Sequence, residues 1–339
     1  MLSSIRLLTL LVPSGALGAA LHVTPAVAQT NPVTITEWEV PWGADTRPRD
    51  PYVAPDGRVF FVGQAGNYVA ALEPSSGKFT RFEIDSGTHP HNLIVDSKGT
   101  VWYAGNRNAM IGQLDPATGQ IIRHPMPNGV PRDPHTLLFD DREQNIWFTA
   151  QQAGKVGRLN MASGKLDIID MATERARPYG IWLDSKGRPW ICEFGTNKLA
   201  MIDPATLEVT EFPLPHERAR ARRLVVTPDD MVWYVDYTRS FLGRLDPKTG
   251  EVKEWQSPGG TGALPYAMSL DDKGRIWYVE TGLKPSRLVG WDPKTEKFFS
   301  ITPIAESGGL TVRHMYFDPE RREFWFGTDA GTIARAKVP

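Results

Sequence analysis

The stretch that decides the fold is Arg177–Pro215, RPYGIWLDSKGRPWICEFGTNKLAMIDPATLEVTEFPLP. It contains four short runs of β-type residues separated by turn residues: Tyr179–Asp184, Pro189–Glu193, Lys198–Asp203 and Glu208–Phe212. Asp-Ser-Lys-Gly and Asp-Pro-Ala-Thr, which lie at the first and third boundaries, are typical of tight turns. Four such strands form one small antiparallel sheet. Because this sheet cannot cover its own apolar faces, the pattern predicts that it stacks on copies of itself.

The copies are found along the chain, each marked by an aromatic residue in its second run. These residues recur at intervals of 42 to 48 positions: Phe60, Trp102, Trp147, Trp190, Trp233, Trp277 and Trp325. This is the period of four-stranded propeller blades. The sequence therefore predicts an all-β fold, a seven-bladed β-propeller of four-stranded antiparallel blades.

The last copy indicates how the ring closes. It begins near Thr311, its third run is Thr332–Lys337, and the chain then has no room for a fourth. The segment Val33–Pro41 resembles the fourth runs of the other copies. We therefore predict that the N-terminal strand Thr34–Val40 completes the last blade, because an open ring would leave unpaired strand edges.

Residues 1–28 have the features of a secretory signal peptide. Arg6 precedes the apolar run Leu7–Val12, and Ala26-Val27-Ala28 comes directly before Gln29. This pattern predicts cleavage after Ala28. We expect residues 29–339 to form a single propeller domain that is periplasmic or secreted. No later segment is long and apolar enough to predict a membrane span in the mature chain.

The charge and cysteine content exclude some partners. The whole chain has a formal net charge of −1 and contains one cysteine, Cys192. A near-neutral chain without a basic block is not expected to bind nucleic acid. A single cysteine cannot form an intrachain disulfide, and its place in a predicted strand indicates a buried thiol. We expect a monomer.

Alignment of the copies predicts a ring of ionisable side chains on the face that carries the loops between blades. At the start of the first strands lie Arg49, His91, His135, Tyr179, Arg222, Tyr266 and Arg313. At the end of the second strands lie Gly63, Gly105, Ala150, Glu193, Asp236, Glu280 and Thr328. Such a ring favours an anionic or oxygenated ligand, either a small molecule or an oligomer. The alternative is that these groups only line a wet channel.

The repeat also resembles a known family. A proline followed by histidine or tyrosine, then Asp-x-x-Gly-x-x-Trp, an Asp-Pro-x-Thr-Gly turn and Glu-Phe-Pro-Leu-Pro are similar to the streptogramin B lyase (virginiamycin B lyase) family over residues 33–339. The resemblance implies elimination across the ester C–O bond of a cyclic depsipeptide, with Mg²⁺. The sequence itself indicates no organic cofactor and identifies no metal ligands.

The catalytic residues of the family can be transferred to matching positions only in part. The histidine–glutamate pair of one blade falls on Tyr266 and Glu280, and the histidine of the neighbouring blade falls on Arg222. A second copy of the pair falls on Tyr179 and Glu193. Tyrosine and arginine thus replace the family's histidines. The glutamates are retained.

Two main interpretations follow. In the first, the protein is a carbon–oxygen lyase that acts by elimination on a lactone, an ester or an anionic oxygenated substrate. Its catalytic residues would be Tyr266, Glu280 and Arg222. Its substrate-binding residues would be Arg49, His91, His135, Tyr179, Glu193, Asp236 and Arg313. In the second, the protein is a non-catalytic periplasmic propeller that binds a ligand or a protein on the same face. A lactone-hydrolysing propeller, with calcium held by Glu193, Asp236 and Glu280, is a third alternative.

Overall fold

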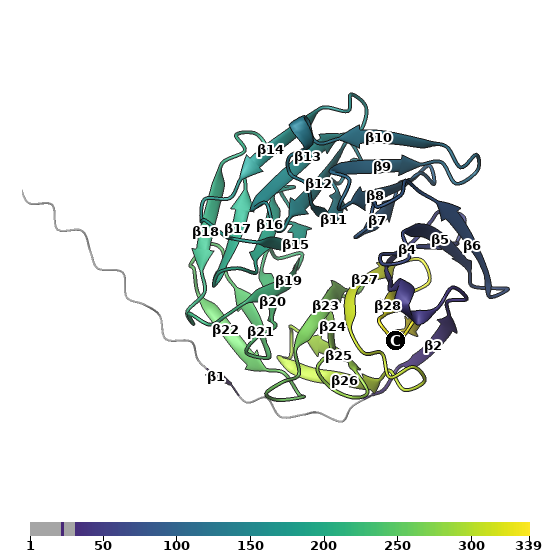
Figure 1. Ribbon diagram of the computed structural model, residues 1–339. Coiled ribbons are helices and arrows are strands. Elements are labelled where there is room, and N and C mark those ends of the chain that lie inside the picture. Colours follow the sequence, from purple (N-terminus) through teal and green to yellow (C-terminus); the bar gives the residue numbers. More distant parts are fainter. Residues whose placement is uncertain (1–21, 24–30) are drawn as a thin grey trace, which may run out of the picture.

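The computed structural model describes residues 22–23 and 31–339, and it shows seven four-stranded antiparallel units arranged in a ring (Figure 1). The predicted seven-bladed propeller is thereby confirmed. Most of the predicted signal peptide, residues 1–28, lies outside the described residues. The exception is β1 (His22–Val23), which pairs in parallel with the outer strand of blade 5. Within the described ranges, no helix is long and apolar enough to cross a membrane.

The blades are numbered in chain order, and each runs from an inner first strand to an outer fourth strand. Blade 1 consists of β3 (Pro48–Val53), β4 (Val59–Gly63), β5 (Tyr68–Glu73) and β6 (Lys78–Glu83). Blade 2 consists of β7 (Leu93–Val95), β8 (Val101–Gly105), β9 (Met110–Leu114) and β10 (Ile121–Pro125). Blade 3 consists of β11 (Pro134–Phe139), β12 (Asn145–Ala150), β13 (Lys155–Asn160) and β14 (Leu166–Asp170).

The remaining blades continue in the same way. Blade 4 consists of β15 (Pro178–Leu183), β16 (Pro189–Glu193), β17 (Lys198–Ile202) and β18 (Val209–Pro213). Blade 5 consists of β19 (Ala221–Val226), β20 (Val232–Asp236), β21 (Phe241–Leu245) and β22 (Val252–Gln256). Blade 6 consists of β23 (Pro265–Leu270), β24 (Ile276–Glu280), β25 (Arg287–Asp292) and β26 (Lys297–Pro303). Blade 7 consists of β27 (Val312–Asp318), β28 (Glu323–Thr328), β29 (Thr332–Lys337) and β2 (Thr34–Glu39).

Two short 3₁₀ segments lie in crossovers between blades. They are η1 (Ala44–Thr46), which precedes blade 1, and η2 (Pro127–Gly129), which precedes blade 3. The strands of blade 4 begin and end within one residue of the four runs read from the sequence. Glycine ends the first turn of that blade because Gly187 has a φ of 71°, which side chains with a Cβ rarely adopt.

A repeated hydrogen-bond pattern explains the Asp-x-x-Gly-x-x-Trp motif. In blade 4, Asp184 Oδ1 accepts from the backbone N–H of Lys186 (2.9 Å) and Arg188 (3.0 Å). Its Oδ2 accepts from Trp190 Nε1 at 3.0 Å. One carboxylate therefore closes the first turn and fixes the buried indole of the second strand. The same indole bond joins Asp96 to Trp102 and Asp271 to Trp277.

The bond depends on a spacing of six residues from the aspartate to the tryptophan. In blade 5, Thr227 occupies the aspartate position, and in blade 7 an extra residue separates Asp318 from Trp325. In both blades the buried tryptophan Nε1 has no hydrogen-bond partner among the described residues. Trp233 in blade 5 instead stacks on Trp255, with ring centroids 5.3 Å apart.

The hydrophobic core lies between the blades. Each of the seven interfaces between neighbouring blades contains its own cluster of buried apolar side chains. Between blades 4 and 5, for example, Trp190 and Leu199 pack with Leu224 and Tyr234. Each blade is therefore stabilised by packing against its two neighbours, and closure of the ring joins the first blade to the last.

The N-terminal strand closes the ring as predicted. β2 pairs antiparallel with β29 from Thr34↔Lys337 to Glu39↔Thr332. The Trp38 ring stacks on Trp325, with centroids 5.4 Å apart. Blade 7 thus combines strands from the two ends of the described chain.

In six of the seven blades the first strand bends where it reaches the channel. The pairing of first and second strands skips between Pro134 and Leu137 in blade 3 and between Pro178 and Ile181 in blade 4. The same irregularity occurs in blades 1, 5, 6 and 7. Such β-bulges interrupt the normal alternation of side chains. In these six blades the first-strand residues predicted to form the ring lie at the bends, whereas His91 of blade 2 lies just before β7.

Removal of residues 29–41 should lower the melting temperature by about 10 °C or more, because the deletion opens the ring and uncovers the edge of β29. Thermal unfolding followed by circular dichroism measures this. Thr34→Ala, a change at an exposed position of the same strand, is the control and should melt like the wild type. A near wild-type melt of the deletion would refute the role of β2 in closure.

Asp184→Ala should cost about 3 kcal/mol of unfolding free energy, because it leaves a buried indole N–H and two turn amides without their acceptor. Asp203→Ala is the matched control: the Asp203 side chain accepts from the backbone N–H of Ala205 and Thr206 in a more exposed turn. The control should lose much less stability than Asp184→Ala. Urea denaturation compares the two variants, and equal losses would contradict the importance of the indole bond.

Candidate functional site

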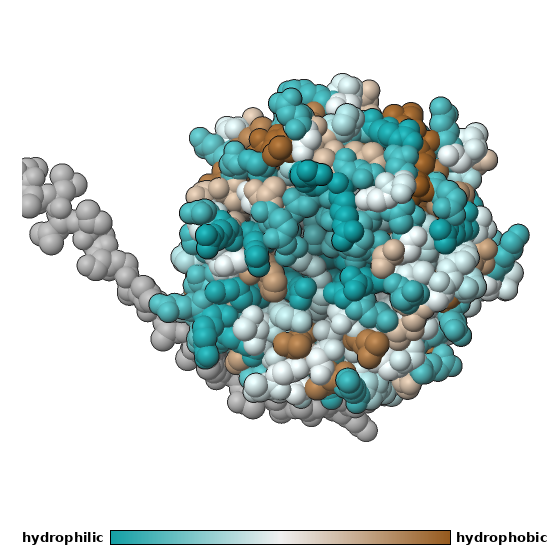
Figure 2. Space-filling model, viewed as in Figure 1, coloured by the Kyte–Doolittle hydropathy of each residue, from teal (hydrophilic) through white to brown (hydrophobic). Residues whose placement is uncertain are grey.

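The ring residues of blades 1 to 4 meet in one line of contacts around the channel. Arg49 Nη1 lies 3.2 Å from His91 Nε2. The rings of His91 and His135 lie with their centroids 3.5 Å apart, and the rings of His135 and Tyr179 lie 4.3 Å apart. All four side chains are buried. Hydrophilic residues also gather over the middle of the ring in Figure 2. The structure thus brings together residues that are 42 to 44 positions apart along the chain.

Blades 4 to 6 contribute a cluster of two tyrosines and one arginine. The hydroxyl groups of Tyr179 and Tyr266 form a short hydrogen bond. Arg222 Cζ lies 3.8 Å from the centroid of the Tyr266 ring and 5.1 Å from that of Tyr179. It also lies 4.7 Å from the ring of Phe194 and 4.3 Å from that of Tyr237. The guanidinium therefore occupies an aromatic cage, where the negative faces of the rings attract its charge.

Nearby arginines and burial give the two tyrosines different pKa values. Burial opposes ionisation of Tyr179, but the charges of Arg222, Arg223 and Arg49 outweigh burial and lower its pKa below the usual value. Burial, together with the negative charge of Tyr179, raises the pKa of Tyr266 to about 12. The hydrogen-bonded pair therefore loses its first proton more readily than an isolated buried tyrosine would, and Tyr179 holds most of the resulting charge.

Arg313 is held differently from the other ring residues. It forms an ion pair with Asp329 of its own blade. Its Nε is buried and has no hydrogen-bond partner in the described part of the chain. Arg313 therefore adds little net charge to the channel, although its guanidinium helps to lower the pKa of His91.

Both carboxylate oxygens of Glu280 accept hydrogen bonds from neighbouring residues. Glu280 Oε1 accepts from Ser257 Oγ at 2.7 Å and from the Gly259 backbone N–H at 2.6 Å. Its Oε2 accepts from Arg287 Nε at 2.8 Å, across the β24–β25 pair. Among the described residues, no hydrogen bond or ion pair joins Glu280 to Tyr266. The carboxylate fixes the loop before blade 6, and its predicted catalytic role stays a prediction.

Asp236 organises a loop in blade 5. Its Oδ1 accepts from the backbone N–H of Arg220 (3.1 Å), Thr238 (3.2 Å) and Arg239 (3.1 Å). Its Oδ2 pairs with Arg239 Nη1 at 3.2 Å. Burial raises the pKa of this carboxyl group in spite of these donors. Asp236 therefore holds the connection between β20 and β21.

Glu193 belongs to a pair of carboxyl groups. Its Oε2 accepts from Thr196 Oγ1 at 2.8 Å, while the neighbouring Glu211 accepts from Lys198 Nζ at 2.6 Å. Burial raises the pKa of Glu193 to about 7, and the negative charge of Glu211 adds to the effect. Burial and the nearby charge of Glu211 therefore favour the protonated form of Glu193.

Sequence reasoning missed a second, deeper set of channel residues, each of which directly follows a ring position. We call this set the inner tier: Asp50, Asn92, Thr136, Arg223 and His314. Asn92 Nδ2 donates to Asp50 Oδ2 at 3.0 Å, and Arg223 Nη1 donates to Thr136 Oγ1 at 3.1 Å. Strand alternation places such residues on the opposite side, but in blades 1, 3, 5 and 7 the bulges turn them toward the axis, and Asn92 lies just before β7. The sequence does contain a signal for this set, because the residue that follows the ring position is polar in five of the seven copies.

The channel does not offer the ligands that a divalent metal requires. No three His, Cys, Asp or Glu side chains of residues 22–23 and 31–339 are grouped so that they could hold an ion. Mg²⁺ prefers several carboxylate and water oxygens in octahedral geometry, and Glu280 already has its oxygens occupied. The donor set does not fit Mg²⁺, which remains an expectation from the family resemblance.

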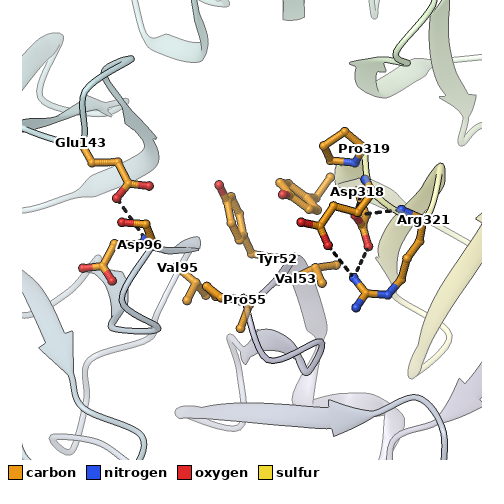
Figure 3. Close-up of a pocket in the computed structure, with 13 residues that line it drawn as sticks. Tyr52, Val53, Pro55, Val95, Asp96, Glu143, Asp318, Pro319 and Arg321 are labelled. Atoms are coloured by element: carbon orange, nitrogen blue, oxygen red, sulfur yellow. Dashed lines mark hydrogen bonds and ion pairs between the residues drawn. The ribbon is translucent and has the colours of Figure 1, made fainter.

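A separate cavity of about 230 Å³ lies at the opposite end of the first strands (Figure 3). Its lining includes Tyr52, Pro55, Glu143, Asp318 and Arg321. Glu143 accepts from the Ser97 backbone N–H, and Asp318 pairs with Arg321. None of the predicted site residues lines this cavity. The candidate site is therefore the bulge end of the channel.

Comparisons with known proteins agree with this architecture. The family model described as the virginiamycin B lyase family matches residues 11–288. Selenomethionine-substituted virginiamycin B lyase from Staphylococcus aureus has a TM-score of 0.79 at 22% identity, covering 90% of this chain and 99% of that chain. A streptogramin B lyase structure has a TM-score of 0.79 at 23% identity, covering 90% and 98%. These likenesses show the fold.

A further similar structure is a catalytically inactive histidine-to-alanine variant of the Staphylococcus aureus enzyme with quinupristin. It has a TM-score of 0.79 at 23% identity and covers 90% of this chain and 99% of that chain. No functionally curated protein matches the chain. The family model covers most of the sequence, residues 11–288. The chain belongs to the virginiamycin B lyase family.

Proposed function

We propose that the protein is an exported carbon–oxygen lyase that opens a lactone or ester, or cleaves another anionic oxygenated substrate, by elimination. The proposal places the reaction at the cluster of Tyr179, Tyr266 and Arg222. The observation that carries it is the hydrogen-bonded tyrosine pair, with one guanidinium lying against both rings. Such a pair can hold a proton, release it and remain near a positive charge.

Tyr179 is the proposed base. Its phenolate would take a proton from the carbon beside the substrate carbonyl. The arginine charges lower the pKa of Tyr179, so a larger fraction is ionised near neutral pH than for a free tyrosine, whose pKa is about 10. Histidine has this role in the family pattern, but no histidine occupies the corresponding position in blades 4 to 6.

Arg222 and Tyr266 complete the proton balance. As the C–H electrons form the new C=C bond, the C–O bond breaks and its electron pair remains on the leaving oxygen. Arg222 would stabilise the enolate charge, and the Tyr266 hydroxyl would give its proton to that oxygen. The proton taken by Tyr179 then passes to Tyr266 along their hydrogen bond. The enzyme returns to its starting state without a co-reactant.

Access to the cluster is from the rim of the aromatic cage. Tyr179 and Tyr266 are buried, whereas Phe194, Arg222 and Tyr237 are partly exposed. A substrate would therefore meet Arg222 first and contact the two flanking rings. These flat surfaces suit a cyclic substrate with aromatic or apolar parts. Quinupristin, the ligand in the related crystal structure, is accordingly the first compound to test, followed by simple lactones and acyl esters.

Tyr179→Phe should lower kcat at least about 100-fold, because it removes the base. Tyr266→Phe should lower kcat about tenfold or more, since water can replace the acid only in part. Formation of a conjugated double bond, followed by ultraviolet absorbance and mass spectrometry of the opened product, measures turnover. Tyr103→Phe is the matched control, because the buried Tyr103 hydroxyl lacks a hydrogen-bond partner in the described structure. Full activity of Tyr179→Phe, or no turnover by the wild type across the panel, would refute the proposal.

The rate should rise with pH as the tyrosine pair loses its first proton. Arg222→Gln should move the midpoint of this rise upward by about one pH unit or more, because loss of a nearby positive charge disfavours the phenolate. Arg222→Lys keeps the charge and should move the midpoint less. Profiles of kcat/KM against pH for the three proteins test this. An unchanged midpoint in Arg222→Gln would exclude the tyrosine pair as the ionising group.

A further inference from the structure

The inner tier contains a buried arginine without a counter-charge. Only 3% of Arg223 is exposed. Its Nη1 donates to Thr136 Oγ1 and its Nε donates to the Arg313 backbone oxygen, each at 3.1 Å. Its Nη2 is buried without a hydrogen-bond partner among the described residues. No carboxylate of the described chain lies within ion-pair distance of Arg223, and an unpaired buried charge costs several kcal/mol.

Two other arginines of the channel ring are paired with carboxylates, whereas Arg222 lies in the aromatic cage. Arg49 is neutralised by Asp50 through a 2.9 Å ion pair, and Arg313 is neutralised by Asp329. Burial, together with the charges of Arg49 and Arg223, lowers the pKa values of His91 and His135 well below the usual value, so both rings are neutral. One positive charge, that of Arg223, therefore remains in the inner tier.

The hydrogen bonds also identify two histidine N–H groups without partners. Arg49 can only donate, so His91 Nε2 accepts from it and the ring proton is on Nδ1. Thr136 Oγ1 accepts from Arg223, and among the described hydrogen bonds the acceptor for its own proton is His135 Nδ1, at 2.9 Å. We therefore assign the His135 ring proton to Nε2. His91 Nδ1 and His135 Nε2 are both buried without a partner in the described part of the structure.

We propose that the inner tier binds the carboxylate group of a small organic acid, with Arg223, His135 and His91 as donors. The unsatisfied polar atoms of these three residues are all donors, which suits an acceptor-only group. The single excess positive charge matches a monoanion, and a guanidinium offers paired donors to the two oxygens of a carboxylate.

The site adjoins the tyrosine pair. The His135 ring lies 4.3 Å from the ring of Tyr179, and Arg223 Cζ lies 5.2 Å from the same ring. A substrate carboxylate in the inner tier would place the neighbouring carbons beside Tyr179. This role as a substrate anchor rests on the proposed function, whereas the binding of a carboxylate does not. The substrate class is thereby narrowed to lactones, esters or ethers that also carry a carboxylate.

Binding of simple carboxylates tests the inference without any turnover. The mature protein is titrated with acetate and succinate, and in parallel with phosphate and chloride, by isothermal calorimetry and thermal shift at neutral pH. We expect carboxylates to bind and to raise Tm. Arg223→Gln should weaken carboxylate binding at least about tenfold. Arg218→Gln, a change at an exposed arginine five residues before Arg223, should bind like the wild type.

A structural role of Arg223 is separated from binding by the stability of the ligand-free variant. Because Arg223 is an unpaired buried charge, Arg223→Gln should fold with equal or greater stability while losing the carboxylate-dependent rise in Tm. No binding of any carboxylate, or equal binding by Arg223→Gln, would overturn the inference. Equal affinity for phosphate and chloride would overturn the assignment to a carboxylate.

The two proposals fail in different ways. Tyr179→Phe should bind carboxylates normally and lose turnover. Carboxylate binding that depends on Arg223, in a protein that catalyses no elimination, would reject the lyase proposal and support the anion site. Turnover of substrates without a carboxylate, unaffected by Arg223→Gln, would reject the anion site and support the lyase proposal.

Discussion

The convergence of seven first strands on one axis is the constraint on which the rest of the structure depends. Neighbouring first strands contact one another around the channel, and in six blades their pairing is interrupted by a bulge at the channel end. A regular strand presents every second side chain to one side. The bulge instead directs two consecutive residues inward, such as Arg222 and Arg223, and so creates two tiers. The Asp–Trp bonds and the closing strand hold the blades in the positions that make this convergence possible.

Burial of so many ionisable groups gives the channel its chemical character. In water, Arg223 and His135 would be solvated, but in the channel their charges and donors must be satisfied by the protein or by a ligand. Asp50 satisfies Arg49 and Asn92, and its own pKa is lowered by Arg49. The channel therefore contains more hydrogen-bond donors than acceptors to pair with them. The positive potential that results both favours an anion and makes the phenol of Tyr179 easier to ionise.

Much of the fold was predictable from the sequence because turn residues and tryptophans mark every blade. The strand limits of blade 4 and the closure by β2 follow from local pattern alone. The ring positions were also predictable, since each lies 11 or 12 residues before the aromatic residue that marks its blade. The direction in which a carboxylate side chain points could not be predicted. Glu280 faces Arg287 because the two residues lie opposite each other in the β24–β25 register. Arg223 could not be placed either, because a bulge reverses the expected orientation of a single residue.

The departures from the family's histidines are best understood as one coupled change. A tyrosine alone, in a buried position, has its pKa raised, as the hydroxyl of Tyr103 does, and could not act as a base near neutral pH. Arginine at positions 222 and 223 supplies the charge that lowers the pKa of Tyr179, while Tyr266 supplies the hydrogen bond that shares its proton. Conversely, an arginine beside a histidine would keep that ring neutral and weaken it as a proton acceptor, as at His135. The two replacements therefore depend on each other: the tyrosine needs the arginine charge to lower its pKa, and the arginine charge would weaken a histidine base.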